Sequence, residues 1–201
     1  MNRTTTGTAR DKIMRKCRES MEMKGKFFDL YAEQIDSLTA EMAQRFTQGK
    51  KLYVMGNGGS ACDALHVAVE FVHPIIEKRK PLPAIALMTD VATMTAISND
   101  LDFSRIFVNQ IKLMGQPGDM VLAISTSGKS PNLIYALQAS REKEMLTIAF
   151  SGKDGGRMPE VSDYCFTVPS FSIHRIQEVQ ETLLHILWDM IHVHLGEEDV
   201  I

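Results

Sequence analysis

Five short apolar runs recur along the chain, and we interpret each of them as a buried strand. They lie at 51–55, 84–87, 120–124, 146–150 and 164–168. Between them, apolar residues recur every three or four positions, which predicts helices at 60–77, 89–97, 103–114, 132–142 and 174–195. Strands that alternate with helices imply parallel crossovers, so we expect an α/β fold with one doubly wound, five-stranded parallel sheet.

A longer helical pattern precedes the first strand, over residues 11–48. Its apolar stripe is formed by Met14, Cys17, Met21, Phe28, Tyr31, Ile35, Leu38 and Met42. The stripe is long for a helix that covers one sheet, and Gly25 is a point where we expect the helix to break or bend. We therefore expect a second subunit to bury part of this surface. The alternative is a helical hairpin within the chain.

Length, charge and cysteine content limit the class of protein. The 201 residues suit one domain, with a helical oligomerisation segment at 1–48 and an α/β core at 49–195. The net charge of −3 argues against nucleic acid or an anionic membrane as the main partner. The sequence contains no apolar run long enough for a membrane-spanning helix and no apolar signal-peptide core near its start. Three widely spaced cysteines are typical of reduced thiols, so we expect a cytoplasmic protein.

The stretch GNGGSACDALHVAVE, residues 56–70, follows the first strand. A strand that runs into a glycine turn and then a helix presents backbone N–H groups to an anionic ligand. Ser60 is the predicted N-cap of this helix, with Asp63 as its capping-box partner. His66 and Glu70 are four residues apart, hence on one helical face, where they could be metal ligands or an acid/base pair. The alternative is a packing unit with a surface His–Glu pair.

A second loop, STSGKSP, follows the third strand directly. The hydroxyls of Ser125, Thr126, Ser127 and Ser130 converge there with free N–H groups at a helix N-terminus, where Pro131 is expected at position N1. This chemistry suits a phosphate monoester. The spacing is not that of a Walker A loop, and the alternative is a serine-rich turn that caps a helix.

The last predicted helix carries Gln177, Glu181 and His185 at intervals of four residues on one side. In an open α/β sheet, the loops at Gly56, Ser125 and Ser151 line one edge, near which ligands bind. A single histidine on such a helix often has only a structural role, so the helix alone does not establish a site.

Taken together, GNGGSACDALHVAVE, SND, STSGKSPN and RIQEVQETLLH resemble the sugar isomerase (SIS) domain family, and within it the bacterial phosphoheptose isomerases. The resemblance extends from the N-terminal helix to His192. It implies a three-layer sandwich that converts sedoheptulose 7-phosphate to D-glycero-D-manno-heptose 7-phosphate through an enediol. It also implies a homotetramer with one zinc ion per subunit.

The resemblance assigns roles to individual residues. Substrate contacts are implied for Asn57, Gly58, Gly59, Asn99, Asp100, Ser125, Thr126, Ser127, Ser130 and Gln177. Zinc ligation is implied for His66, Glu70, Gln177 and His185. Glu70 matches the proposed general base and His185 the proposed general acid, and both residue types suit enediol chemistry.

Two departures and one rival function follow from the same comparison. Gln180 stands where many members of the family carry a histidine, and Glu181 adds a carboxylate to the functional face. The rival is a non-catalytic SIS adaptor that binds the replication-initiator protein. Such adaptors lack the histidine that His185 supplies here, so the sequence favours the enzyme.

Overall fold

The sheet is the centre of the fold, and its five strands are all parallel. The computed structural model describes residues 7–75 and 79–199. The strands are β1 (Leu52–Gly56), β2 (Ala84–Ala86), β3 (Met120–Ile124), β4 (Leu146–Gly152) and β5 (Tyr164–Val168). Their order is β2-β1-β3-β4-β5, which places the topological switch point between β1 and β3. The predicted doubly wound sheet is therefore confirmed.

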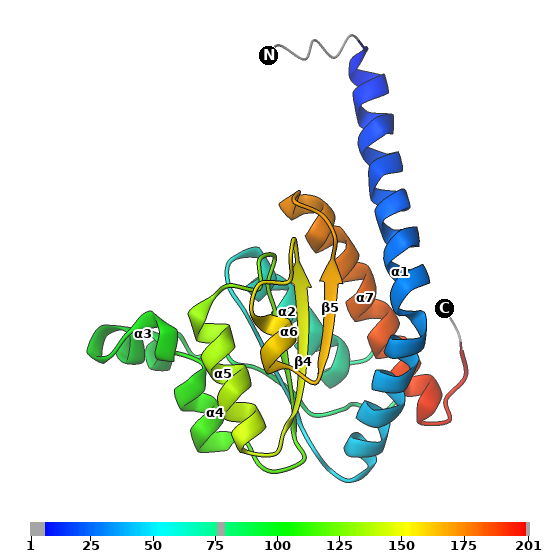
Figure 1. Cartoon of the computed structure of the whole chain (residues 1–201). Helices are drawn as coiled ribbons and strands as arrows, with labels where there is room; N and C mark the ends of the chain where they lie inside the picture. The colour runs from blue at the N-terminus through cyan, green and yellow to red at the C-terminus, as the bar shows by residue number, and fades with distance from the viewer. Residues whose placement is uncertain (1–6, 76–78, 200–201) are drawn as a thin grey trace.

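Helices cover both faces of the sheet and make three layers (Figure 1). Three helices pack on one face: α1 (Ala9–Thr47), α2 (Gly59–Val72) and α7 (Ile173–His194). The 3-10 helix η1 (Phe103–Arg105) and the helices α4 (Val108–Met114), α5 (Pro131–Glu142) and α6 (Met158–Val161) lie on the other. Alternate strand residues point to the two layers, since Leu122 and Ile124 join the first core and Val121 and Ala123 the second. Every residue of β1, β3 and β4 is buried, which explains their unbroken apolar runs.

The N-terminal segment is one helix of 39 residues, so Gly25 does not break it, and the alternative of a hairpin is wrong. A glycine inside a helix costs only about 1 kcal/mol, which the rest of this helix outweighs. Thr8 and Asp11 form a capping box at its start. Its second half is buried through residues such as Leu38 and Met42, whereas its first half extends beyond the core in Figure 1 and leaves Met21 58% exposed.

Several predicted element ends need correction. Gly58 is the N-cap of α2 and no side chain caps it, so the predicted capping box of Ser60 and Asp63 is wrong. This helix ends at Val72 rather than 77, and residues 77 and 78, where we placed its end, lie outside the described residues. Helix α2 ends early because Pro74 cannot continue its hydrogen bonding.

The segment between β2 and β3 also differs from its prediction. Helix α3 (Val91–Asp100) confirms the helix predicted at 89–97, with Asp90 as its N-cap, but it continues three residues further, through Ser98, Asn99 and Asp100. The predicted helix at 103–114 is divided into η1 and α4. The short helix α6 was not predicted, because its four residues are too few to show periodicity. Among the described residues, every helix is too short or too polar to cross a membrane.

Candidate functional site

The loops after β1 and β3 meet at the switch point, as predicted for the carboxyl edge of the sheet. The side chains of Asn57 and Asn132 exchange two hydrogen bonds, of 3.0 and 2.8 Å. Asn132 is buried at the start of α5, directly after Pro131 at N1. Sequence reasoning did not include Asn132 among the site residues, because its partner is 75 positions away in the chain.

The loop at 125–130, which we call the phosphate loop, is shaped by its own first residue. Ser125 is buried, and its Oγ accepts hydrogen bonds from the N–H groups of Ser127 (3.2 Å) and Gly128 (3.1 Å). Gly128 has a φ of +63°, and a Cβ there would overlap the carbonyl of Gly155. Only glycine fits this position. Ser130 is the N-cap of α5 but makes no side-chain capping bond, so its hydroxyl is available to a ligand.

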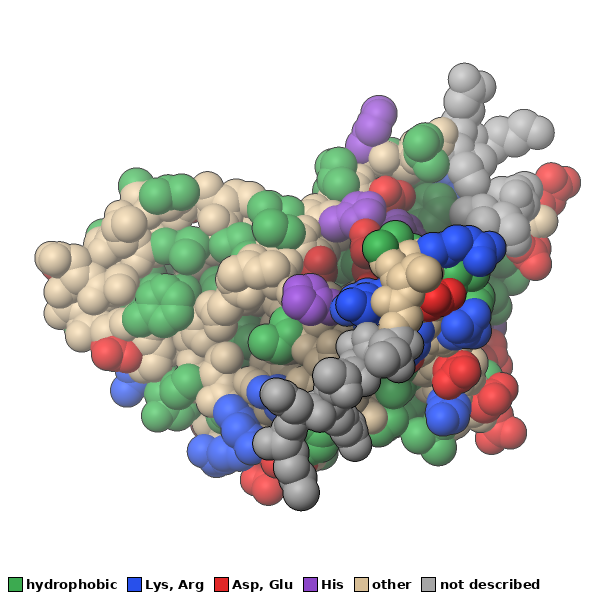
Figure 2. All heavy atoms as spheres, turned by 90° about the horizontal axis from the view of Figure 1, so that it is seen from above, with side chains coloured by type: hydrophobic (Ala, Val, Ile, Leu, Met, Phe, Trp, Pro, Cys, Tyr) green, Lys and Arg blue, Asp and Glu red, His purple; other side chains and the backbone are tan. Residues whose placement is uncertain are grey.

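Helices α2 and α7 bring together three of the predicted metal ligands. His66, Glu70 and His185 each offer one ligand atom, and these atoms all lie within 4.8 Å of one another. His66 Nε2 is 3.3 Å from Glu70 Oε1, and the rings of His66 and His185 meet edge to face with centroids 4.9 Å apart. Figure 2 views the molecule from the end toward which the strands point, and shows histidine side chains close to acidic ones on that face.

Gln177 lies against the glycine loop. A Cβ placed on Gly59 would overlap Gln177 Nε2, so the amide occupies the space that the glycine leaves open. Gln177 is half-buried in the second turn of α7, whose N-cap is Ser172. The fourth predicted ligand is therefore on the same helix as His185 and next to the start of α2.

Asp63 is a member of the site that the sequence analysis considered only as a cap. Burial, and then the carboxylate of Glu181 on α7, raises its pKa to about 6, although His66 acts in the opposite direction. Its Oδ2 is buried and has no hydrogen-bond partner among the described residues. Asp63 thus lies within electrostatic reach of both Glu181 and His66, beside the group of His66, Glu70 and His185.

A cavity of about 630 Å³ opens beside the cluster. Glu70 and His185 line it together with Trp188, Asp189 and Ile75. Its lining residues come from α2, from α7 and from the segments after them, and none belongs to the phosphate loop. Within the described part of one chain, the metal cluster and the phosphate loop therefore do not share this cavity.

Asn99 and Asp100 are placed apart from the other predicted residues. They lie in the last turn of α3, where Asn99 Nδ2 donates to Asp100 Oδ1 over 2.9 Å. Helix α3 has no buried residue and projects from the flank of the molecule opposite α1 and α7 (Figure 1). A substrate role for this pair stays a prediction.

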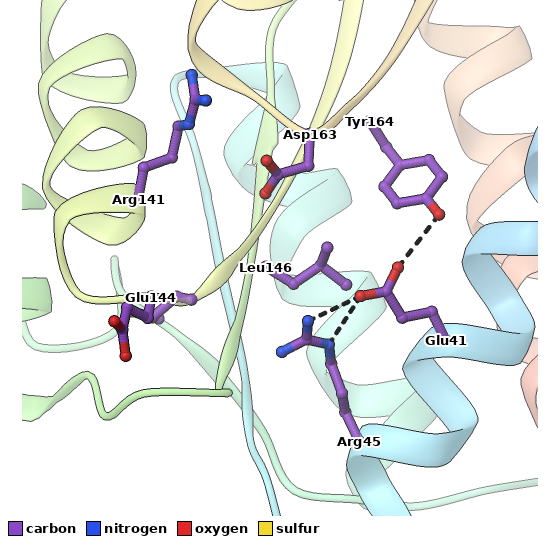
Figure 3. Close-up of a pocket in the computed structure, with 8 residues that line it drawn as sticks. Glu41, Arg45, Arg141, Glu144, Leu146, Asp163 and Tyr164 are labelled. Carbon is purple, nitrogen blue, oxygen red and sulfur yellow. Dashed lines mark hydrogen bonds and ion pairs between the residues drawn. The ribbon is translucent and has the colours of Figure 1, made fainter.

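A separate cavity of about 350 Å³ lies at the other edge of the sheet, beside the first residues of β4 and β5 (Figure 3). Arg45 donates to Glu41 Oε1 from both Nε and Nη2, and the hydroxyl of Tyr164 donates to Glu41 Oε2. Asp163 accepts from the N–H and the hydroxyl of Thr147. These groups satisfy one another's hydrogen-bonding capacity. They therefore link α1 to the sheet and leave few polar atoms free to bind a ligand in the cavity.

Comparison with known proteins agrees with this arrangement. The model of the SIS domain matches residues 17–152. The phosphoheptose isomerase of Aquifex aeolicus is 42% identical over 181 residues, which cover 90% of this chain and 95% of that protein. That of Thermodesulfovibrio yellowstonii is 44% identical over 181 residues and 90% of each chain. The structure of a phosphoheptose isomerase from Francisella tularensis superposes with a TM-score of 0.88 at 35% identity, over 93% of this chain and 100% of that one. The chain therefore belongs to the SIS domain family and, within it, to the phosphoheptose isomerases.

Proposed function

We propose that this chain is an aldose–ketose isomerase that converts sedoheptulose 7-phosphate to D-glycero-D-manno-heptose 7-phosphate. The observation that carries the proposal is the convergence of His66, Glu70 and His185 between α2 and α7. The identity of about 40% with proteins named phosphoheptose isomerase supports the choice of substrate. The rival adaptor function has no support in these relatives.

The reaction moves one hydrogen from C1 to C2 and one from O1 to O2. Glu70 removes a proton from C1 of the ketose, the C–H electrons form the C1–C2 double bond, and the carbonyl electrons move to O2. His185 supplies a proton to O2 and removes the proton from O1, which gives the enediol and then the new carbonyl at C1. Glu70 returns its proton to C2. A carboxylate and an imidazole are therefore sufficient for the proton transfers.

The donor set also fits zinc. Imidazole nitrogens and a carboxylate oxygen are ordinary zinc ligands, and two ligands of a tetrahedral ion stand roughly 3.4 Å apart. The separation of 3.3 Å between His66 Nε2 and Glu70 Oε1 agrees with this, although an ion pair would give the same value. His66, Glu70 and His185 would hold the ion, which would polarise the substrate carbonyl when bound. Gln177 is proposed as its fourth ligand, and in this structure its amide lies against Gly59, roughly 10 Å along α2 from His66. Because Oε1 of Glu70 faces His66, its Oε2 is the atom left for the proton.

The phosphate loop is proposed to hold the phosphate of the sugar. Hydroxyls of Thr126, Ser127 and Ser130, and N–H groups at the start of α5, are suited to phosphate oxygens. We place Asn57 and the neighbouring glycines against the sugar chain, since Asn57 is held at the loop by Asn132.

We further propose a homotetramer with sites between subunits. The exposed apolar side chains of the first half of α1, such as Ile13 and Met21, need a covering surface. A site between subunits would also explain why the cavity beside Glu70 does not reach the phosphate loop. Three free cysteines suit a reducing compartment, so the cytoplasm is the proposed location.

Proton and phosphorus NMR of the purified protein with sedoheptulose 7-phosphate, with and without zinc, tests the proposal. We expect the aldose phosphate to appear in the wild type and to be lost in Glu70→Gln and His185→Ala. Deuterium from the solvent should enter the product at C2, because the proton resides on Glu70 between its two transfers. A folded protein that binds the sugar phosphate but does not turn it over in either metal state would refute the enzyme.

A further inference from the structure

Gln180 is a buried glutamine that connects α7 to the ends of two strands. Its side chain is almost fully buried. Its Nε2 donates one hydrogen bond to the carbonyl of Ser125 (2.8 Å) and another to the carbonyl of Ser151 (3.2 Å). Because both acceptors are carbonyl oxygens, the nitrogen must face them, and this fixes the orientation of the amide.

These two carbonyls belong to the phosphate loop and to the loop that supports it. Ser125 begins the phosphate loop and shapes it through its Oγ. The second loop follows β4, and Ser151 near the end of that strand donates its hydroxyl to the carbonyl of Gly155 over 3.0 Å. Arg157 N–H then donates to the carbonyl of Gly128, within the phosphate loop. Gln180 therefore contacts both loops at the point where they leave the sheet.

The same helix carries the reacting end of the site. Gln177 lies one turn before Gln180 and contacts Gly59, and His185 follows further along α7 beside His66. A sugar phosphate that is held at both ends needs a fixed distance between the phosphate loop and these side chains. The side chain of Gln180 directly connects the phosphate loop to α7, the helix that carries Gln177 and His185.

We propose that Gln180 is a positioning residue that sets the phosphate loop relative to α7, and so fits the site to the length of the sugar phosphate. The inference rests on the proposed function in one respect, that the phosphate loop holds the phosphate of the substrate. Gln180 acts through Ser125 and does not itself touch the reacting atoms.

The burial of Gln180 supports this role. Its Oε1 is also buried and has no hydrogen-bond partner among the described residues, which disfavours glutamine at this position on stability grounds alone. An apolar side chain would avoid that cost but would leave the carbonyls of Ser125 and Ser151 without this donor. The function of the amide at this position is therefore to hold the carbonyls of Ser125 and Ser151.

The chain offers a matched control in Gln110 on α4. Gln110 is also buried, and its Nε2 donates to two backbone carbonyls, of Leu87 (3.0 Å) and Ile106 (2.8 Å). Neither carbonyl belongs to the phosphate loop or to α7. Gln180→Met and Gln110→Met remove the same number of donors and keep a side chain of similar size. A merely structural role predicts the same result for both variants.

The experiment compares melting temperature, KM and kcat for sedoheptulose 7-phosphate, and the Kd of inorganic phosphate measured by calorimetry. Gln180→Met should lose no more melting temperature than Gln110→Met, because it also removes the unpaired buried Oε1. Only Gln180→Met should raise KM and the phosphate Kd, by roughly 10-fold, with a smaller change in kcat, because a displaced loop mainly weakens binding of the phosphate. Equal KM and phosphate Kd in the two variants would overturn the inference.

Two further arms keep the test decisive. If Gln180→Met does not fold, Gln180→Asn keeps the amide but is one methylene too short to reach both carbonyls. A raised phosphate Kd in this variant supports the inference, and an unchanged Kd refutes it. If the wild type binds phosphate but does not isomerise the sugar, the proposed function fails, and the phosphate Kd still decides the role of Gln180.

Discussion

Substitution of Gly59 by alanine should separate stability from activity. Gly59 is the first residue of α2, and its φ lies outside the left-handed region that only glycine favours. The added Cβ would overlap Nε2 of Gln177 and come within 3.4 Å of its Cδ. The overlapping atom is the end of a flexible side chain, so Gln177 must move while the helix can stay.

The substitution should increase the stability of the helix slightly and decrease the activity of the enzyme. Alanine in place of glycine stabilises a helix by up to about 1 kcal/mol, and by less in the first turn. Displacement of Gln177 removes one proposed ligand of zinc and substrate, and losses of this kind reduce activity roughly 10- to 100-fold. Gly59→Ala should therefore melt at the same or a slightly higher temperature in the presence of a chelator, while kcat/KM falls.

Gly58→Ala, one residue earlier, is a control for stability only, because Gly58 is itself proposed to lie against the sugar chain. Gly58 has a φ of +55° and a ψ of −123°, and a Cβ there meets nothing within 4 Å. The backbone strain should cost about 1–3 kcal/mol of folding free energy, with Gln177 left in place. Thermal unfolding of both variants and NMR-monitored turnover of Gly59→Ala make the comparison. Full activity of Gly59→Ala would show that activity does not depend on the position of Gln177. A large loss of stability in Gly59→Ala would show that the backbone of α2 moves instead of the Gln177 side chain.

Two titrating groups give predictions for stability against pH. The folded pKa of Asp63, about 6, is above the unfolded value of 3.8, so its ionisation destabilises the fold as pH rises from 3.8 to 6 and the penalty remains above that. In a chelator, Asp63→Asn should be more stable than the wild type at pH 8 by ~1–2 kcal/mol, and no more stable at pH 3.5. The gain is smaller than a full two-unit shift would give, because the side chain is only partly buried. Burial lowers the pKa of His192 below its ordinary value of 6.5. Its contribution to the free energy of unfolding is therefore complete above pH 6.5. It declines as the pH falls below that value, because the unfolded chain binds the proton before the folded one does. Urea unfolding between pH 5 and 8 should show a smaller decline in His192→Gln, and an unchanged decline would refute this assignment.

The strands were predictable because burial on both faces produces continuous apolar runs. The bounds of β3 and β5 agree with the sequence prediction to the residue. The start of α2 was not predictable from residue type, since it depends on the unusual backbone of Gly58 and not on the capping preference of Ser60. The positions of Asn99 and Asp100 also depend on context, because the apolar pattern of α3 ends at Ile97 and carries no signal for the last turn of the helix.

Within the candidate site, local spacing and tertiary contact contributed differently. The interval of four residues predicted that His66 and Glu70 share a face, and they are 3.3 Å apart. The approach of His185 depends on how α7 packs beside α2, which the residues indicated only through the family resemblance. The roles of Asp63 and Gln180 were beyond sequence reasoning, because one depends on the opposing Glu181 and the other on two strand-end carbonyls.

Helix α7 explains why the long N-terminal helix belongs to the same functional unit as the site. Gln177, Gln180 and His185 each need a particular rotation of α7, and a shift by one residue along a helix turns every side chain by about 100°. Contacts with α1 fix that rotation: Ser20 donates to Glu178 over 2.6 Å, and Arg175 donates to the carbonyl of Lys16 over 2.8 Å. The chemistry at the sheet edge therefore depends on packing between two helices that are far apart in the sequence, and only one of them carries site residues.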